Sequence, residues 1–319
     1  MGQGITSPAH LGRDRSTVDW NRDHPPALSV ASGVQIELEM LDAAGGQLGP
    51  SSTLADFHVL DPNRTMPIHG PIYVEGAKPG DVLQVDLLEI EIGSFGWTGQ
   101  RPGQGVLPPE MFPEEWVQIW TIDGDRAAFR PGISIPLEPF PGMIGVALAD
   151  EGGHSSDPPR RVGGNMDTKQ LVAGSTLYLP IEVEGALFGI GDGHAAQGDG
   201  EVCGSAIEVP MDVSVRLTVR RDFSIDAPQF EVRTPLERPS AAAAGYYVTT
   251  GVDPDLYAAS REAVHSMVRH LAERHGLDPQ DAYGLCSVAA DLKISEIVDW
   301  PNLMVSLFLP LDIFSPPGS

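Results

Sequence analysis

Residues 209–220 alternate between apolar and polar side chains in a strict period of two. Successive side chains of a β-strand point to opposite faces, so this pattern predicts a strand with one buried face and one wet face. A chain with such a strand must build at least one sheet around it. Weaker signals of the same kind occur at residues 34–40, 72–74, 82–92, 143–148, 175–183 and 186–190.

Glycine and proline separate these apolar runs. The chain has 36 glycines and 29 prolines, spread in short clusters, which is typical of many short strands joined by tight turns. Pro79 and Gly80 supply turn chemistry between two of the runs. Strands that face one another across a packed core suggest a sandwich or a barrel.

Helical spacing occurs only late in the chain, at about residues 253–293. Asp253 and Pro254 predict the start of one helix and Gly276 its end, and Asp278 with Pro279 repeats the start signal. The two predicted apolar stripes are Val264, Met267, Val268 and Leu271, and then Leu285, Val288, Ala289 and Leu292. The sequence therefore predicts a mainly β fold: a β-sandwich-like body with accessory α-helices near the C-terminus, α+β overall.

The acidic balance of the chain excludes several classes of partner. Asp and Glu total 44 against 20 Lys and Arg, and the formal net charge of −24 repels nucleic acid and anionic lipid surfaces. No apolar stretch is long enough to cross a bilayer, and the first residues lack the apolar region of a signal peptide. The two cysteines lie far apart, which favours a reducing compartment. We therefore expect a cytoplasmic protein with no nucleic-acid or membrane partner.

Side chains that can bind metal or move protons concentrate between residues 163 and 208. Asp192 and His194 are one residue apart, so in an extended segment they point to the same side and suit one cation. A carboxylate with an imidazole fits zinc or another first-row divalent metal, whereas oxygen ligands alone fit calcium; we favour zinc and keep calcium open. A solvated surface turn is the alternative interpretation. The other candidate polar residues in the two glycine-rich runs of this region and just after them are Asn165, Asp167, Gln197, Asp199, Glu201 and Glu208.

Familiar nucleophile motifs are missing: the sequence has no GxSxG, HExxH or CxxC. Cys203 is an alternative nucleophile with His194 as its base, although a free cysteine at the start of a strand is more often a small buried residue. His69 and His154 lack metal-type spacing to a neighbour, so we expect structural or surface roles for them. Trp97 is a candidate for the wall of an apolar pocket, although a lone tryptophan more often belongs to the core.

Four segments together resemble the acetamidase/formamidase family: PIYVEGAKPGD at residues 71–81, GGNMD at 163–167, LPIEVEGALFGIGDGHAAQGDGEVCGSAIE at 179–208, and DAYGLCSVAADLKISEIVD at 281–299. The resemblance runs from about residue 25 to 314, which leaves residues 1–24 as an N-terminal extension to a single domain at 25–319. It implies a β-sandwich-like fold with accessory helices, a homo-oligomer (dimer or tetramer), a divalent metal, and hydrolysis of formamide, acetamide or a similar short amide. By position, the family's site pattern falls on Asn165, Asp167, Asp192, His194, Gln197 and Glu201.

These residues give a mechanistic hypothesis. Asp167, Asp192 and His194 hold the metal, and Glu201 acts as general base and then protonates the departing ammonia, so Asp192, His194 and Glu201 are the expected catalytic residues. Asn165 and Gln197 are expected to bind the substrate. The alternatives are a cysteine-nucleophile amidase using Cys203, or a noncatalytic small-molecule-binding oligomer. Residues 64–69 and 94–120 depart from the family pattern, so if they line the pocket the preferred amide differs from the usual ones.

Overall fold

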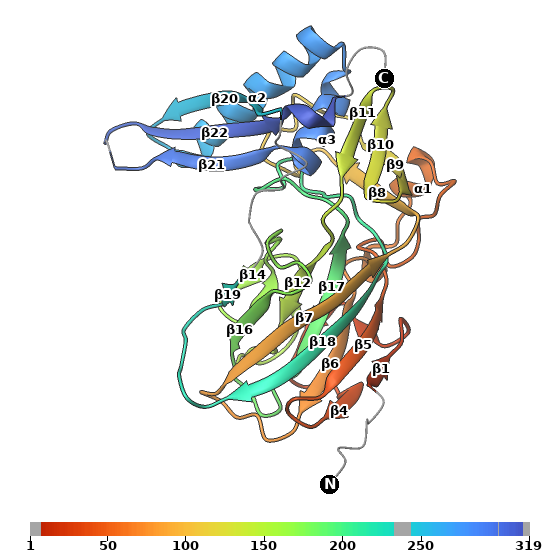
Figure 1. The fold of residues 1–319 in the computed structure, drawn as a ribbon, viewed down its shortest axis with the longest axis vertical. Coiled ribbons are helices and arrows are strands. Elements are labelled where there is room, and N and C mark those ends of the chain that lie inside the picture. The colour runs from red at the N-terminus through yellow and green to blue at the C-terminus, as the bar shows by residue number, and fades with distance from the viewer. Residues whose placement is uncertain (1–7, 233–243, 299, 315–319) are drawn as a thin grey trace.

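The computed structural model describes residues 8–232, 244–298 and 300–314 (Figure 1). Two sheets face each other in the lower body of the molecule. The first is six-stranded within the described residues and contains, in spatial order, β1 (Ala9–Leu11), β5 (Gln35–Met40), β18 (Met211–Arg220), β7 (Val82–Ile92), β16 (Thr176–Pro180) and β19 (Gln229–Glu231).

The second sheet carries the polar segment of interest. Its order is β14 (Pro159–Arg160), β15 (Gly163–Asn165), β12 (Phe140–Gly145), β17 (Phe188–His194), β6 (Ile68–Val74) and β2 (Ser16–Thr17), with β4 (Leu28–Val30) also paired to β6. Side chains from both sheets, such as Val85 and Leu217 from the first and Ile72 and Phe188 from the second, belong to one buried apolar cluster. The lower body is therefore a β-sandwich.

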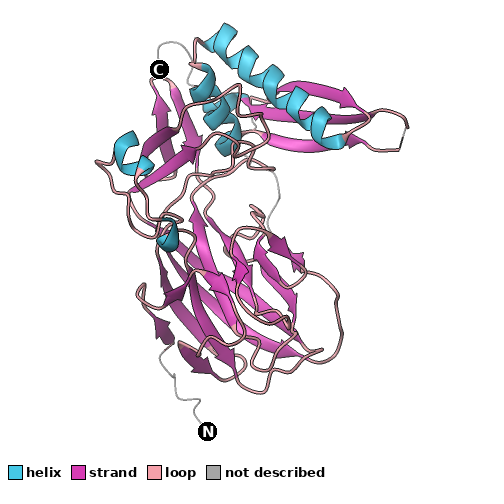
Figure 2. Cartoon of the chain, turned by 180° about the vertical axis from the view of Figure 1, so that it is seen from behind, coloured by secondary structure: helices cyan, strands magenta, loops and turns pink. Residues whose placement is uncertain are grey.

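A second body follows above the sandwich and holds the helices (Figure 2). It contains an antiparallel four-stranded sheet, a three-stranded sheet that extends sideways as an arm, and helices that cover one face of the arm. The elements are β8 (Phe95–Gln100), β9 (Trp116–Asp123), β10 (Arg126–Arg130), β11 (Ile133–Pro136), β20 (Tyr246–Asp253), β22 (Leu303–Pro310), β21 (Asp291–Glu296), α1 (Leu54–His58), α2 (Leu256–His275) and α3 (Pro279–Ala289); β3 (Asp19–Trp20) and β13 (His154–Ser155) form a separate pair.

The mainly β prediction, with helices near the C-terminus, is confirmed. The alternating segment forms β18, which lies between β5 and β7, and its Val213 and Val215 are buried while Asp212 and Arg216 are exposed. Hydrogen bonding on both edges and a one-sided apolar face explain why this strand carries the clearest signal.

The predicted boundaries of four elements are wrong by a few residues. Helix α2 begins after Asp255, whose side chain accepts from the backbone N–H of Ala258, because Asp253 still pairs with Leu303 in β20. Helix α3 ends at Ala289, so Leu292 belongs to strand β21 rather than to the helical stripe. Strand β17 starts two residues later than expected and continues through His194, and β12 lies at Phe140–Gly145 rather than 143–148.

Residues 8–24 lie against the sandwich. Strand β1 pairs in parallel with β5, and β2 pairs with β6. Residues 1–7 lie outside the described ones, and the boundary between an extension at 1–24 and a domain at 25–319 stays a prediction. Among the described residues, no helix is long and apolar enough to span a membrane.

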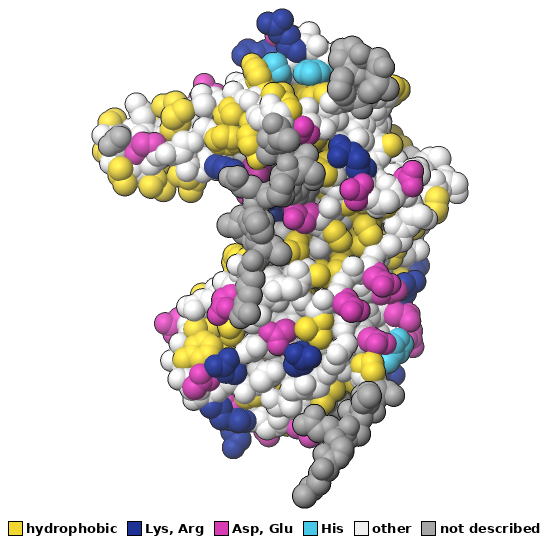
Figure 3. Space-filling view, viewed as in Figure 1, with side chains coloured by type: hydrophobic (Ala, Val, Ile, Leu, Met, Phe, Trp, Pro, Cys, Tyr) yellow, Lys and Arg dark blue, Asp and Glu magenta, His cyan; other side chains and the backbone are white. Residues whose placement is uncertain are grey.

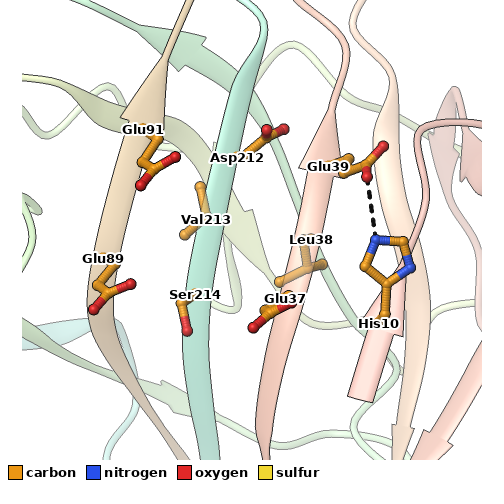
Figure 4. A pocket seen from close by; sticks show the side chains of 9 residues that line it. All are labelled: His10, Glu37, Leu38, Glu39, Glu89, Glu91, Asp212, Val213 and Ser214. Atoms are coloured by element: carbon orange, nitrogen blue, oxygen red, sulfur yellow. Dashed lines mark hydrogen bonds and ion pairs between the residues drawn. The ribbon is translucent and has the colours of Figure 1, made fainter. Parts of the chain in front are cut away.

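The outer face of the six-stranded sheet is strongly acidic. Glu39, Asp212 and Glu91 stand opposite one another across three strands, and Glu37 and Glu89 lie two residues along (Figure 4). These carboxylates border a groove of about 280 Å³ on the solvent side of the sheet. Because they are hydrated, they add to the net charge of the chain without requiring a bound cation.

Candidate active site

Strand β17 delivers Asp192 and His194 to the same side of the second sheet. Oδ2 of Asp192 lies 3.2 Å from Nε2 of His194, and the two residues are 3% and 0% exposed. The alternation of side chains along a strand accounts for this contact, and the edge of Phe140 packs against the imidazole ring at 5.1 Å between ring centroids. The two side chains therefore form a fixed carboxylate–imidazole pair.

Glu208 completes the centre of the cluster. Its Oε2 lies 3.2 Å from Nε2 of His194, and its Oε1 accepts hydrogen bonds from the backbone N–H of Ala206 at 2.9 Å and from Oγ of Ser205 at 3.1 Å. An antiparallel bridge joins His194 directly to Glu208. Glu208 is one of the carboxylates of the predicted polar region but is not among the six predicted site residues; its one sequence signal is an acid placed just before the apolar alternation that starts at residue 209.

Asp167 and Glu201 approach the same imidazole from two loops. Ligand atoms of Asp167, His194 and Glu201 lie within 4.8 Å of one another, as do those of Asp192, His194 and Glu208. Asp167, Asp192 and Glu201 all adopt left-handed backbone conformations, with φ of 45°, 56° and 42°. This conformation is costly for residues with a Cβ, so three cases at one place indicate that the surrounding fold holds these carboxylates here.

Two amide side chains support Asp167. Asn165 donates from Nδ2 to Oδ2 of Asp167 at 3.2 Å, and Gln197 donates from Nε2 to the carbonyl oxygen of Asp167 at 2.9 Å. Asn165 thus orients the Asp167 carboxylate and Gln197 holds the backbone of Asp167, while the side-chain oxygen atoms of both amides have no partner among the described residues. The structure brings together all six residues named from the sequence.

Gly142 provides the space that this cluster needs. It lies on β12, beside β17, and a Cβ at this position would lie 2.6 Å from Cε1 of His194, 2.7 Å from Oδ1 of Asp167 and 2.8 Å from Oδ2 of Asp192. Any larger residue would push into all three side chains. The close packing of functional groups therefore depends on a glycine that lies outside the glycine-rich segment.

Several buried polar atoms of the cluster lack an ordinary hydrogen bond. Nε2 of His194 faces two carboxylate oxygens, yet neither contact has hydrogen-bond geometry. Buried polar atoms are nearly always satisfied, so their convergence at one point marks a place for a cation or a polar ligand. The unpartnered atoms are Oδ1 of Asn165, Oδ1 of Asp167, both ring nitrogens of His194, Oε1 of Gln197 and Oε2 of Glu208.

Burial and neighbouring negative charge raise the pKa values of three of the clustered carboxylates, Asp167, Glu201 and Glu208. Burial, with neighbouring Asp192 and Glu208, raises the pKa of Asp167 to about 7, despite the opposing effect of His194. Burial and Asp167 raise the pKa of Glu201 well above its usual value, and burial also raises the pKa of Glu208. Burial opposes protonation of His194, but the Glu208 and Asp192 carboxylates outweigh it and raise its pKa well above normal. A divalent cation would offset this concentrated negative charge.

A cleft of about 330 Å³ reaches the cluster from the side of the four-stranded sheet. Its lining includes Asn165, Ser205 and Glu208, and the last two are buried. The remaining lining residues come from the loop around α1, from residues 94–120, and from two further loops: Ala43, Ala44, Phe57, Leu60, Thr65, Met66, Trp97, Gly99, Arg101, Gln104, Asp157 and Gly204. The segment that departs from the family pattern thus lines a cleft at the cluster.

Cys203 lies close to this region but is unsuited to attack. Its side chain is fully buried, its Sγ donates to the carbonyl oxygen of Ser205 at 3.7 Å, and burial raises the pKa of the thiol to about 12. Because the thiolate is the nucleophilic form, this cysteine is held unreactive near neutral pH. Of the other histidines, His69 is buried and accepts from the backbone N–H of Leu41 at 3.1 Å, and His154 lies in β13; neither belongs to the two groups around His194.

Comparisons with known proteins identify the family to which this chain is similar. The model of the acetamidase/formamidase family matches residues 6–151 and 148–316. A formamidase of Methylophilus methylotrophus is 27% identical, with 92% of this chain and 88% of that protein covered. The structure of a gamma lactamase from Delftia acidovorans has a TM-score of 0.86 at 27% identity, covering 94% of this chain and 89% of that one. An acetamidase structure from Bacillus halodurans has a TM-score of 0.67 at 32% identity, covering 95% and 97%.

Proposed function

This chain belongs to the acetamidase/formamidase family and is an amidase, as its sequence predicts, and we propose that it hydrolyses a small amide to carboxylate and ammonia with the help of a divalent metal ion. One observation carries the proposal: four carboxylates surround one buried imidazole, and several of their polar atoms have no partner within the described residues. Such a group of oxygen and nitrogen ligands fits zinc or another divalent metal better than it fits a folded core without an ion.

The residues that would hold the metal are Asp167, Asp192 and His194, and Glu208 joins them through its contact with His194. When bound, the metal would supply Lewis acidity toward the amide carbonyl and lower the pKa of a water. Gln197 and Asn165 keep Asp167 in place through their hydrogen bonds, and their free oxygen atoms suit the N–H groups of an amide. Buried acids and amides thus bind and orient the reacting group.

Glu201 is the proposed proton carrier. It is only partly buried, whereas Asp192, His194 and Glu208 are almost fully buried, so Glu201 is the more accessible acid. Burial and the Asp167 carboxylate raise the pKa of Glu201, so it binds a proton more tightly than an ordinary carboxylate, as suits a group that accepts a proton from water and passes it to the leaving nitrogen. Amides are poor electrophiles with poor leaving groups, and both proton transfers are needed.

The test is Glu201→Gln, which keeps the size and polarity of the side chain. We expect unchanged metal content and a turnover lower by about two to four orders of magnitude, the usual contribution of general acid–base catalysis. Glu89→Gln, on the exposed acidic face of the sandwich, is the matched control and should retain full turnover. Unchanged turnover in Glu201→Gln would remove Glu201 from the mechanism.

A homo-oligomer is also proposed, with the arm as its contact region. Hydrophobic side chains gather on the arm (Figure 3), and its tip exposes Ile297 at 55% and Val298 at 80%. Exposed apolar groups of this kind mark association surfaces more often than free surface. Light scattering on the purified chain, compared with Val298→Asp, tests this proposal, since a monomeric mass for the unmodified chain would exclude it. Cytoplasmic location stays a prediction from the sequence.

A further inference from the structure

The cleft above the cluster has an apolar wall of its own. Phe57 and Trp97, with ring centroids 5.9 Å apart, belong to a small buried cluster that is separate from the main core. Ala43 and Ala44 are buried in the same cluster, and Leu60 and Met66 pack against it. All six residues line the cleft. This apolar cluster is separate from the main core and lines a cleft, so it is suited to hold an apolar group of a ligand.

Backbone pairing places this wall directly beside the reacting groups. The N–H of Trp97 donates to the carbonyl oxygen of Glu208 at 3.0 Å, and the N–H of Glu208 donates to the carbonyl oxygen of Trp97 at 2.7 Å. Glu208 also forms a bridge with His194. Directly opposed residues of an antiparallel pair project to the same face, so the indole, the carboxylate and the imidazole lie in sequence on one side. A ligand in the cleft that contacts Glu208 therefore lies beside Trp97.

The size of the cleft exceeds what the smallest amides need. Its volume of about 330 Å³ falls within the ~300–1,000 Å³ range of sites that enclose drug-sized ligands. Formamide and acetamide have only a few non-hydrogen atoms and would leave most of the cleft filled with water. Leu60 and Met66 are the half-buried members of the apolar lining, so a larger apolar ligand that displaces this water and covers them gains affinity.

The charged residues of the cleft do not provide a receptor for an anionic substituent. Arg101 donates from Nε to Glu115 at 3.0 Å and from Nη2 to the carbonyl oxygen of Phe57 at 2.8 Å, and its guanidinium lies 4.6 Å from the centre of the Phe57 ring. Its charge is therefore neutralised, and it forms part of the wall. Asp157 at the lining and the buried acids repel anions.

We propose that the preferred substrates are amides whose acyl or ring portion is uncharged and apolar and larger than a methyl group, with that portion seated against Phe57, Leu60 and Trp97. This inference rests on the proposed amidase activity and specifies its substrate class. It also assigns a role to residues 94–120, through which Trp97 and Gly99 shape the wall. Gly99 is needed there because a Cβ would lie 2.5 Å from two carbons of the Phe57 ring.

The experiment is a steady-state comparison of formamide, acetamide, butyramide, hexanamide, phenylacetamide and succinamate with the metal-loaded enzyme. Each methylene seated on the wall should raise kcat/KM about fourfold, the change that corresponds to ~0.8 kcal/mol for a buried CH₂. Hexanamide and phenylacetamide should exceed acetamide at least tenfold, and succinamate should fall below butyramide because of its carboxylate.

A pair of neighbouring variants isolates the wall. Leu60→Lys places a charge on it, whereas Val59→Lys places the same charge one residue away, at a side chain that is 74% exposed and does not line the cleft. Leu60→Lys should lower the ratio of hexanamide to acetamide kcat/KM at least tenfold, and Val59→Lys should leave that ratio unchanged. Because both substrates are measured on one preparation, partial misfolding does not change the ratio.

The outcomes separate the two proposals. Best activity on formamide or acetamide, with no gain along the series, would overturn the apolar-substrate inference and leave the amidase proposal intact. An unchanged ratio in Leu60→Lys would also overturn it. Failure of the metal-loaded enzyme to hydrolyse any of the amides would defeat the proposed function and this inference together.

Discussion

Gly142→Ala adds a single methyl group at the centre of the proposed site. The new Cβ would lie 2.6 Å from His194, 2.7 Å from Asp167 and 2.8 Å from Asp192, whereas ordinary van der Waals contact begins at 3.4 Å. The side chains must therefore retreat by about 0.6–0.8 Å. Misplacement of catalytic groups by ~1 Å costs about 10²-fold in rate. We expect kcat/KM to fall about 10²-fold and the free energy of unfolding to fall by ~1–3 kcal/mol from overpacking.

The assay is ammonia release with the best amide of the series, together with metal content and thermal unfolding of the same samples. Gly93→Ala is the matched control, because a Cβ there meets nothing within 4 Å and the glycine does not have a positive φ. Its activity should stay within about twofold of the unmodified enzyme, since surface substitutions are usually nearly neutral. Full activity and metal content in Gly142→Ala would refute the claim that these three side chains act together.

Three further predictions concern protonation and the thiol. His69 is buried with its pKa lowered to about 4, so acidification protonates this histidine in the unfolded chain before the folded one. Between pH 7 and 5 the contribution of His69 to the unfolding free energy should fall by about 2 kcal/mol, measured in urea titrations as the difference in pH dependence between the unmodified protein and His69→Gln. In metal-free protein the pKa of Asp167 is raised from 3.8 to about 7, so the folded protein holds this proton more tightly than the unfolded chain. Raising the pH from about 4 to 7 should therefore lower the melting temperature. Asp167→Asn should lose part of this pH dependence of the melting temperature. Cys203→Ala should retain kcat within about threefold in the amide assay, because burial keeps the thiol protonated; a loss of 10³-fold or more would instead support a thiol nucleophile.

Local rules were sufficient for part of this site. The contact between Asp192 and His194 follows from side-chain alternation within one strand, and needs no knowledge of the remaining chain. The same rule identifies β18, where burial follows the apolar positions. Short-range chemistry also predicts the start of α3, where the Asp278 side chain accepts from the backbone N–H of Gln280.

The other contacts of the site depend on pairing between segments that are far apart in the sequence. Glu208 reaches His194 through a bridge between separate segments, and Gly142 reaches it through the register of β12 on β17, neither of which is encoded in local spacing. Strand pairing also overrides helical periodicity: Leu292 continues the apolar stripe of α3 by spacing, but its segment pairs with β22 instead. The cleft could not be predicted because its wall combines a loop, a hairpin and the buried end of the cluster.

The central claim is that the buried carboxylates and His194 hold a divalent cation. The most direct measurement is an anomalous difference map from crystals of active, metal-loaded enzyme, with data collected on both sides of the absorption edge of the metal. We predict one dominant peak within coordination distance of the His194 imidazole and of at least two of the carboxylates of Asp167, Asp192, Glu201 and Glu208. Fully active crystals without a peak at this cluster would contradict the account.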